Sequence, residues 1–295
     1  MSAAEDLQSG KGRRDENFPV ASLLIEPRFR GPMIAFYRFA RTADDVADHP
    51  STRPDEKLRL LEQMRVSLLG ESERDAPALA LRRMLAERRL PAMHALDLLE
   101  AFRRDASKAR YASWDELMDY CRYSAAPVGR MVLDIHGESQ TTWPASDALC
   151  AALQVINHLQ DCAKDYRELD RVYLPADELA AAGLDVAALD QPAASPALRR
   201  VIVSLAERTG ELLRHSRPLA GQVRNRRLRL EIAFIQRVAE DLTGRLITHD
   251  PLSQRVHHRK LELAGLAVSA LGRVVREPTV RRELETPPES QPQWR

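Results

Sequence analysis

Hydrophobic residues recur every three or four positions along most of the chain, and almost no segment alternates apolar and polar residues at every second position. The first spacing is typical of helices that bury one face, whereas alternation would indicate strands. The pattern therefore predicts an all-α protein. The expected helices span residues 32–48, 54–69, 76–88, 91–104, 113–135, 146–169, 195–222, 225–246 and 252–275.

Polar segments bound this helical pattern at both ends. The opening residues are polar and mixed in charge, which predicts a flexible leader over 1–16. Residues 277–295 are polar and rich in Pro, which predicts a disordered tail. No repeat of fixed period divides the sequence between them. We therefore expect one large all-α domain over residues 17–276.

Three local signals refine the helices. The dipeptide His49-Pro50 is expected to stop the first helix, because a residue before Pro disfavours the helical conformation. The sequence SWDE at residues 113–116 is a capping-box signature that opens a helix. Pro127 and Gly129 fall inside that helix, so a kink or a close approach to a neighbour is expected there.

Charge and cysteine content exclude several classes of protein. The 44 Lys and Arg nearly balance the 43 Asp and Glu, so no basic excess indicates a nucleic-acid partner. Three widely spaced cysteines without a C-x-x-C pair indicate neither a disulfide framework nor a zinc site. No apolar stretch is long enough to span a membrane, which favours a cytoplasmic location. We interpret the basic run at 223–230 as a solvated helix face, with a peripheral membrane contact as the alternative.

The most informative helix is the one that leads into residues 154–175. Its apolar side is formed by Ala152, Ile156, Leu159 and Ala163, so this helix has a packed back. Two amides and two carboxylates lie within about 80° of one another on the other side, at 100° per residue. These residues are Gln154, Asn157, Asp161 and Asp165.

A second acidic cluster, DDVAD at residues 44–48, continues a helix face that passes from apolar to aromatic to charged. Both clusters place carboxylates four residues apart, roughly 6 Å along a helix axis. If the two helices face each other, five carboxylates converge, and such a cluster is unfavourable without cations between them. Oxygen ligands select hard ions, which predicts Mg²⁺ with open positions for phosphate. The candidate metal ligands are Asp44, Asp48, Asp161 and Asp165, with Asp45 beside them.

Basic and aromatic residues around the clusters extend this hypothesis. Metal and basic side chains together make diphosphate a good leaving group, and its departure from a suitable carbon leaves a carbocation. The basic candidates are Arg41, Lys164, Arg167 and Arg171. Aromatic faces can stabilise the cation, and the candidates are Phe36, Tyr37, Tyr120 and Tyr123.

Simpler interpretations apply to several of these features. A single D-x-x-x-D on a helix usually marks a solvated face, and solvated faces generally mix both charge signs. The first cluster instead continues an apolar and aromatic face, and the second shares its stripe with amides and excludes Lys and Arg. His136, His158 and His215 lack a partner at metal-ligand spacing, so structural roles or exposed positions are expected for them. Cys162 has no evident base, which argues against a nucleophile.

The motifs together resemble those of the squalene and phytoene synthase family over about residues 17–245. The resemblance implies an all-α isoprenoid synthase fold with a central cavity flanked by two Asp-rich helices that bind Mg²⁺ and a substrate diphosphate. Asp44, Asp45 and Asp48 match its first motif, and Asp161 and Asp165 match its second. The matching segments are NFPVASLLI, FYRFARTADDVAD, YCRYSAAPVG and QVINHLQDCAKDYRELDRVYLP.

The resemblance also implies roles for residues outside the acidic clusters. One group matches residues near the diphosphate: Tyr37, Arg41, Gln154 and Asn157. Arg171 and Tyr173 match a segment that closes over this end, and Phe18 matches an aromatic residue near the substrate. Residues 125–129 match a kinked helix that lines the cavity.

Within the family, the motifs resemble in particular the bacterial hydroxysqualene synthases of hopanoid and squalene biosynthesis. Many condensing relatives have R-D-x-x-E-D in the second motif, where this chain has Gln160 before Asp161 and Lys164 before Asp165. The resemblance implies that presqualene diphosphate is ionised and water captures the rearranged cation. No NADPH is then expected, and a presqualene diphosphate synthase would hand over the substrate.

Two alternatives stay open. One is a head-to-head prenyl synthase that makes presqualene diphosphate or phytoene from two prenyl diphosphates. The other, from a different class, is a non-catalytic helical assembly or binding protein. The retention of all five aspartates argues against the second alternative.

Overall fold

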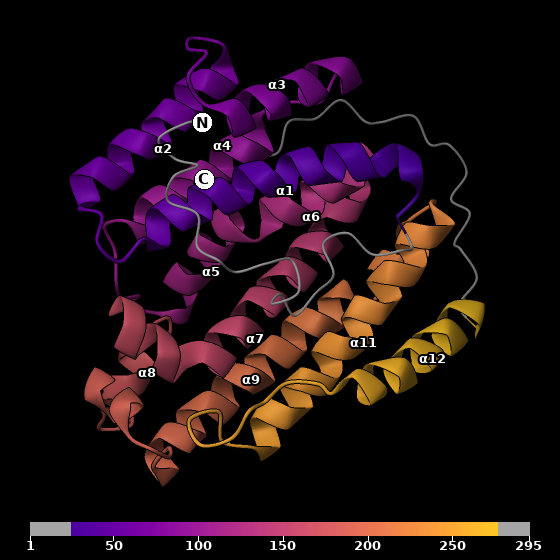
Figure 1. The fold of residues 1–295 in the computed structure, drawn as a ribbon. Helices are drawn as coiled ribbons and strands as arrows, with labels where there is room; N and C mark the ends of the chain where they lie inside the picture. Colours follow the sequence, from indigo (N-terminus) through magenta and orange to yellow (C-terminus); the bar gives the residue numbers. More distant parts are fainter. Residues whose placement is uncertain (1–24, 277–295) are drawn as a thin grey trace.

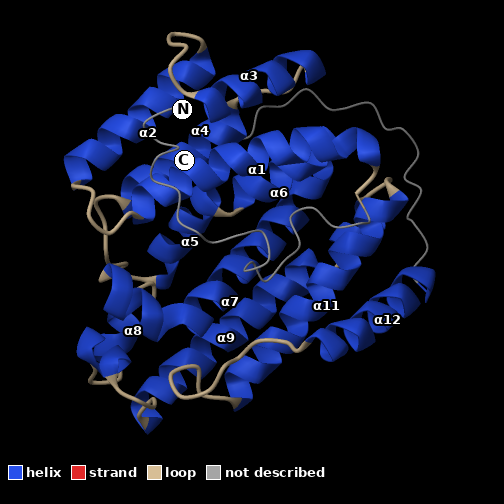
Figure 2. Ribbon diagram, in the orientation of Figure 1, coloured by secondary structure: helices blue, strands red, loops and turns tan. Residues whose placement is uncertain are grey.

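The computed structural model describes residues 25–276, which form a bundle of helices (Figures 1 and 2). Within that range the only β-pairing outside helices is an isolated bridge between Arg110 and Val172, so the all-α prediction is confirmed. Its helices are α1 (Pro27–Asp48), α2 (Pro54–Leu69), α3 (Ala76–Arg88), α4 (Met93–Asp105), α5 (Trp114–Ser124), α6 (Ala126–Ile135), η2 (Gln140–Thr142), α7 (Trp143–Leu169), α8 (Ala176–Ala181), η3 (Val186–Asp190), α9 (Pro196–Ser216), α10 (Leu219–Gln222), α11 (Arg226–Thr248) and α12 (Lys260–Arg276). The expected leader, Phe18 and the expected tail lie outside the described residues.

The N-terminal helices build one apolar core around α1. This helix packs against α3, α4 and α2, and the four occupy the upper part of Figure 1. Phe39 of α1 is fully buried together with Leu61 and Met64 of α2. Burying side chains of this size supplies about 1.5–3 kcal/mol each. The packing therefore fixes the rotation of α1 and with it the direction of its acidic end.

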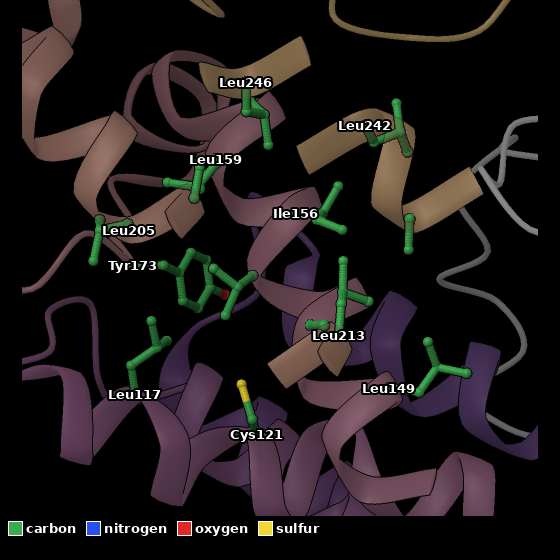
Figure 3. Close-up of a cluster of buried hydrophobic side chains, with 14 of the residues drawn as sticks. Leu117, Cys121, Leu149, Ile156, Leu159, Tyr173, Leu205, Leu213, Leu242 and Leu246 are labelled. Carbon is green, nitrogen blue, oxygen red and sulfur yellow. The ribbon is translucent and has the colours of Figure 1, made fainter. Parts of the chain in front are cut away.

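The C-terminal helices build a second apolar core around α7. This long helix packs against α9 and α11, while α6 covers it from the side of α1. The predicted apolar side of α7 is buried, because Ala152 and Ile156 are both fully shielded from solvent. Figure 3 shows the leucine-rich centre of this core, to which α7, α9 and α11 contribute Ile156, Leu159, Leu205, Leu213, Leu242 and Leu246.

Several helix bounds follow from local chemistry, and others differ from the expectation: α7 begins at Trp143 instead of residue 146, and the helix expected over 195–222 is divided into α9 and α10. Bounds for α2 and α3 match it, and the Asp75 side chain caps α3 by accepting a 2.9 Å hydrogen bond from the Ala78 amide. Helix α1 begins at Pro27 instead of residue 32, so Pro32 lies inside the helix. Helix α12 begins at Lys260 instead of residue 252, because residues 249–259 form an irregular segment.

The interruption expected near Pro127 is real. The predicted helix over 113–135 is two helices that meet at Ala125. A Cβ atom on Gly129 would lie 2.4 Å from the Ser146 hydroxyl oxygen and 2.6 Å from the Cys150 sulfur. Only Gly allows α6 to approach α7 this closely. Both a kink and a close approach therefore occur at the same place.

The expectation that the basic run at 223–230 is a solvated helix face is confirmed only in part. In the basic run, Arg226 and Arg227 are exposed as expected, but Arg229 is only 9% exposed. That residue faces the interior because it lies on the same side of α11 as Ile232 and Gln236, which are also buried. No helix of residues 25–276 combines the length and the apolar character needed to cross a bilayer.

Candidate active site

The acidic ends of α1 and α7 lie next to each other. Arg171 follows α7 directly, and its guanidinium Nη1 donates a hydrogen bond to the Asp48 carboxylate at the end of α1, at 2.5 Å. The negative charge of Asp48 also raises the pKa of Asp165 on α7. The two Asp-rich helices therefore face each other across their C-terminal turns.

In the first cluster, the guanidinium of Arg41 forms ion pairs with two carboxylates. Its Nη1 lies 3.0 Å from Asp44, and its Nη2 lies 2.7 Å from Asp45. The Asp45 side chain is only 4% exposed, whereas that of Asp44 is 38% exposed. Desolvation and the nearby Asp48 charge raise the pKa of Asp44 to about 7 despite the opposing effect of Arg41. Excess negative charge thus remains at the open side of this cluster.

The second cluster also carries excess negative charge. Desolvation by the surrounding protein, followed by the charges of Asp161 and Asp48, raises the pKa of Asp165 to about 7. The half-buried positions on this stripe also include Gln154 and Asn157. A raised pKa means that the protein around these carboxylates disfavours their negative charge near neutral pH. A bound cation would compensate that charge, so such carboxylates are suited to bind one.

The five carboxylates do not form one compact set of metal ligands. Among the side chains of the described residues, no group of three or more His, Cys, Asp or Glu is arranged to hold an ion unaided. Arg41 holds Asp45 on one side, and Arg171 holds Asp48 on another. Mg²⁺ commonly uses one or two carboxylates together with substrate phosphates and water. The arrangement therefore fits an ion shared with a diphosphate, and Mg²⁺ stays a prediction.

Arg171 connects three parts of the site. It is 7% exposed, and its Nη2 donates to the backbone carbonyls of Ala47 at 3.1 Å and Asp105 at 2.9 Å. Lys57 of α2 donates to the same Ala47 carbonyl at 2.8 Å. Arg171 thus acts as a bridge between α1, α4 and the segment after α7, a role that the sequence pattern did not indicate.

Asp105, the last residue of α4, was missed by the sequence reasoning. Its carboxylate accepts a 2.8 Å hydrogen bond from the Tyr120 hydroxyl and a further hydrogen bond from the Tyr173 side chain. Burial raises the pKa of Asp105 to about 6 although Arg171 and these hydroxyls oppose the shift. The residue stands in the charged string FRRDASK, which reads as a helix end, so only its tertiary contacts distinguish it.

Stacked rings line the segment beyond Arg171. The Tyr173 ring stacks on His158 with centroids 3.5 Å apart, and on Tyr111 with centroids 5.5 Å apart. Burial and the neighbouring Arg171 lower the pKa of His158 to about 3, so this imidazole is neutral at physiological pH. Gln154 Nε2 lies 3.2 Å from His158 Nε2. The structural role expected for His158 agrees with this packing.

Other expected residues lie in different surroundings. Phe36 is buried in the N-terminal core, and Tyr37 is half-buried on α1. The Tyr123 ring is covered by guanidinium groups at 4.2 and 4.8 Å, which leaves its faces unsuited to a carbocation. Arg167 pairs with Asp190 on the surface at 2.8 Å and does not join the acidic site. Lys164 is exposed.

The surroundings of the cysteines argue against the nucleophile role that the sequence also disfavoured for Cys162. All three are free thiols, in agreement with the absence of a disulfide pattern. Burial raises the pKa of Cys162 to about 12, which leaves the thiol protonated at neutral pH and therefore a weak nucleophile.

Comparison with known proteins gives consistent matches. A family model described as squalene/phytoene synthase matches residues 12–262. A hydroxysqualene synthase of Rhodopseudomonas palustris is 52% identical over 292 residues and covers 99% of both chains. Another, of Zymomonas mobilis, is 54% identical over 274 residues and covers 92% of both. The crystal structure of squalene synthase HpnC from Alicyclobacillus acidocaldarius is similar with a TM-score of 0.69 and 34% identity, covering 82% of this chain and 90% of that one.

Proposed function

Because the chain belongs to the squalene/phytoene synthase family, we propose that it converts presqualene diphosphate into hydroxysqualene and diphosphate. Membership makes the protein an enzyme that acts on prenyl diphosphates. The narrower reaction is supported by relatives about half identical in sequence that are named hydroxysqualene synthases. The structural observation that carries the proposal is the meeting of Asp48 on α1 with Arg171 and Asp165 at the end of α7.

These residues are suited to bind and release a diphosphate. When bound, Mg²⁺ would neutralise charge on the leaving diphosphate, with Asp44, Asp48, Asp161 and Asp165 as its proposed ligands. Arg41 holds the first cluster in place through its two ion pairs, with Asp44 and Asp45. Arg171 fixes Asp48 from the opposite side. The site is therefore organised before the substrate arrives, as electrostatic catalysis requires.

The proposed reaction breaks one carbon–oxygen bond and forms another. The bond from carbon to diphosphate breaks, and both electrons leave on the diphosphate. The cyclopropylcarbinyl cation rearranges, a water oxygen adds to it, and the oxygen loses one proton. No electrons are gained from a donor, so the proposal includes no NADPH. The protein must exclude other water from the cation, for which a central cavity between α1 and α7 is part of the proposal.

Two further elements belong to the proposal. The substrate would come from an enzyme that makes presqualene diphosphate, and the C30 alcohol would leave toward a membrane surface because of its apolar character. The location would then be cytoplasmic, with peripheral contact at the inner face of the cell membrane. Liposome co-sedimentation with and without substrate turnover measures that contact directly.

Product analysis tests the reaction. Purified protein with Mg²⁺ and without NADPH receives presqualene diphosphate in one tube and farnesyl diphosphate in another. We expect hydroxysqualene from the first tube and no product from the second. Consumption of farnesyl diphosphate to presqualene diphosphate would instead identify a head-to-head synthase. A matched tube with a chelator in place of Mg²⁺ tests the metal, and full activity there would contradict the metal assignment.

A further inference from the structure

The irregular segment between α11 and α12 is attached to the acidic helix. The side-chain amide of Gln160 on α7 donates to the backbone carbonyl of Val256. His258 lies 2.8 Å from the carboxylate of Asp241 on α11, and Arg245 donates to the His257 carbonyl at 3.4 Å. Val256 is buried and belongs to the C-terminal core. These contacts hold residues 256–258 against both α7 and α11.

This attachment places His257 beside the second acidic cluster. Gln160 immediately precedes Asp161, and Val256 immediately precedes His257, so the hydrogen bond between their neighbours brings the two side chains into the same region. The Asp161 charge acts on His257 accordingly: it raises the pKa of the imidazole, although burial is the larger effect and lowers it. His257 is therefore a neighbour of the acidic site from a segment 96 residues away.

One ring nitrogen of His257 has no partner within the protein. Its Nδ1 is shielded from solvent and makes no hydrogen bond within residues 25–276. A buried polar atom left in this state costs free energy, so such atoms deserve a specific explanation. By contrast, the neighbouring His258 is satisfied by Asp241. The two adjacent histidines thus differ: one fixes the segment, and the other has a buried ring nitrogen without a hydrogen-bond partner.

We propose that His257 binds the diphosphate group of the substrate beside Asp161, and that Gln160 is the residue that positions it. The inference rests on the proposed function, because it assigns a residue to the same diphosphate site. An imidazole N–H can donate a hydrogen bond to a phosphate oxygen, and such a bond to a charged acceptor is stronger than one to a neutral group. Diphosphate thereby supplies the partner that this ring nitrogen lacks, with the imidazole turning toward it because Nδ1 is shielded in the structure.

Calorimetric titration of inorganic diphosphate at saturating Mg²⁺ tests the binding role without turnover. We expect His257→Ala to weaken binding about 10- to 100-fold, the range for one hydrogen bond to a charged group. His249→Ala is the matched control, because His249 is exposed and its ring hydrogen-bonds to Thr248 and Arg245 at the end of α11. His257→Gln retains a donor and is expected to recover part of the affinity. Unchanged affinity in folded His257→Ala and His257→Gln would overturn the inference.

Gln160→Leu tests the positioning role. We expect it to weaken diphosphate binding as His257→Ala does, and the double variant to be no weaker than either single one. With substrate, both changes should raise KM more than they lower kcat. If the two losses of affinity multiply in the double variant, the residues act separately and the positioning role is wrong.

Diphosphate binding and hydroxysqualene formation, both measured on the parent protein, distinguish this inference from the proposed function. If the parent binds inorganic diphosphate and His257→Ala loses that binding, but no hydroxysqualene forms, the proposed reaction fails and the binding role stands. If the parent makes hydroxysqualene and His257→Ala has an unchanged KM and diphosphate affinity, the binding role alone fails. A parent that neither binds diphosphate nor turns over substrate overturns both. Competition between inorganic and presqualene diphosphate tells whether the same site serves product and substrate.

Discussion

Arg171 and Asp48 form an ion pair at 2.5 Å although 123 positions separate them in the sequence. The pair joins the segment after one Asp-rich helix to the end of the other. The same guanidinium also binds the Ala47 and Asp105 carbonyls, so its removal would take a donor from a carboxylate and from two carbonyl oxygens, of which Ala47 keeps Lys57. Arg171 is thus both a structural residue and a neighbour of the proposed diphosphate site.

We expect Arg171→Ala to lower the free energy of unfolding by about 3 kcal/mol, because breaking a largely buried ion pair leaves an uncompensated charge. Turnover should fall as well, since Asp48 loses its fixed position. Arg167→Ala is the control: its pair with Asp190 is exposed, so a change of about 0–1 kcal/mol is expected. Urea unfolding measures both variants. Equal stability of the two would mean that the Arg171 contacts contribute little.

Neutralising one aspartate in each cluster tests the proposed metal ligands. We expect Asp44→Asn and Asp161→Asn each to lower turnover at least ~10²-fold, by analogy with losing one group that stabilises a transition state. Asp170→Asn is a suitable control, because Asp170 is 79% exposed and its left-handed backbone conformation suits Asn. Steady-state kinetics over a Mg²⁺ series gives the comparison. Near-normal rates in either cluster variant would remove that residue from the ligand set.

The raised pKa of Asp165 predicts a pH-dependent stability. Since the pKa is about 7 in the folded protein against an ordinary value of 3.8, the folded state retains a proton that the unfolded state has lost. The stabilisation from this group is complete below pH 3.8 and is lost as the pH rises through about 7. In the absence of metal, Asp165→Asn should therefore melt above the parent at pH 8 and together with it below about pH 4.

Thermal unfolding across that range measures the melting temperatures of variant and parent. The contributions of His158 and other groups cancel in the difference, because both proteins contain those groups. A gain of about 1 kcal/mol corresponds to roughly 2–4 °C in a chain of this size. Asp170→Asn serves as the control for the loss of one exposed carboxylate at the end of the same helix. A pH-independent difference for Asp165→Asn would contradict the raised pKa.

Gly129 and Gly210 form a matched pair for the contact between α6 and α7. Gly129→Ala should destabilise the fold by about 1–3 kcal/mol, because the added methyl group overlaps Ser146 and Cys150. Gly210 in α9 has no atom within 4 Å of an added Cβ, so Gly210→Ala should stabilise by about 0.5–1 kcal/mol. Chemical denaturation of both variants measures whether each substitution raises or lowers the free energy of unfolding. Stabilisation by both substitutions would show that α6 moves away from α7 at little cost.

The sequence pattern was sufficient for the helices whose signals are local. Helices α2 and α3 begin at the expected residues because Pro54 and Asp75 mark their first turns. The start of α1 was misplaced because two prolines, Pro27 and Pro32, both fit a helix beginning, and the structure uses the first. Helix α12 was started too early because its packing on α11 begins only after the segment attached to Gln160 and Asp241.

The acidic stripes of the candidate site could likewise be predicted, because they depend on spacing along one helix. Their partners could not. Asp105, Lys57 and His257 come from three other segments, and each is surrounded in the sequence by ordinary charged residues. Their proximity to the site results from tertiary packing between distant parts of the chain, which a periodic pattern does not encode. The ion pair between Arg171 and Asp48 is of the same kind, whereas Arg41 pairs with residues three and four positions away on its own helix.

The pairing of residues 109–112 with residues 172–177 has a consequence for how substitutions combine. The amides of Val172, Ala176 and Asp177 donate to the carbonyls of Ala109, Tyr111 and Ala112, at 2.9 to 3.1 Å. Two connections from separate halves of the bundle are thereby joined main chain to main chain. Asp105, at the helix end that precedes one connection, and Tyr173, on the other connection, are consequently not independent thermodynamic units, and the effects of changing both should be strongly non-additive.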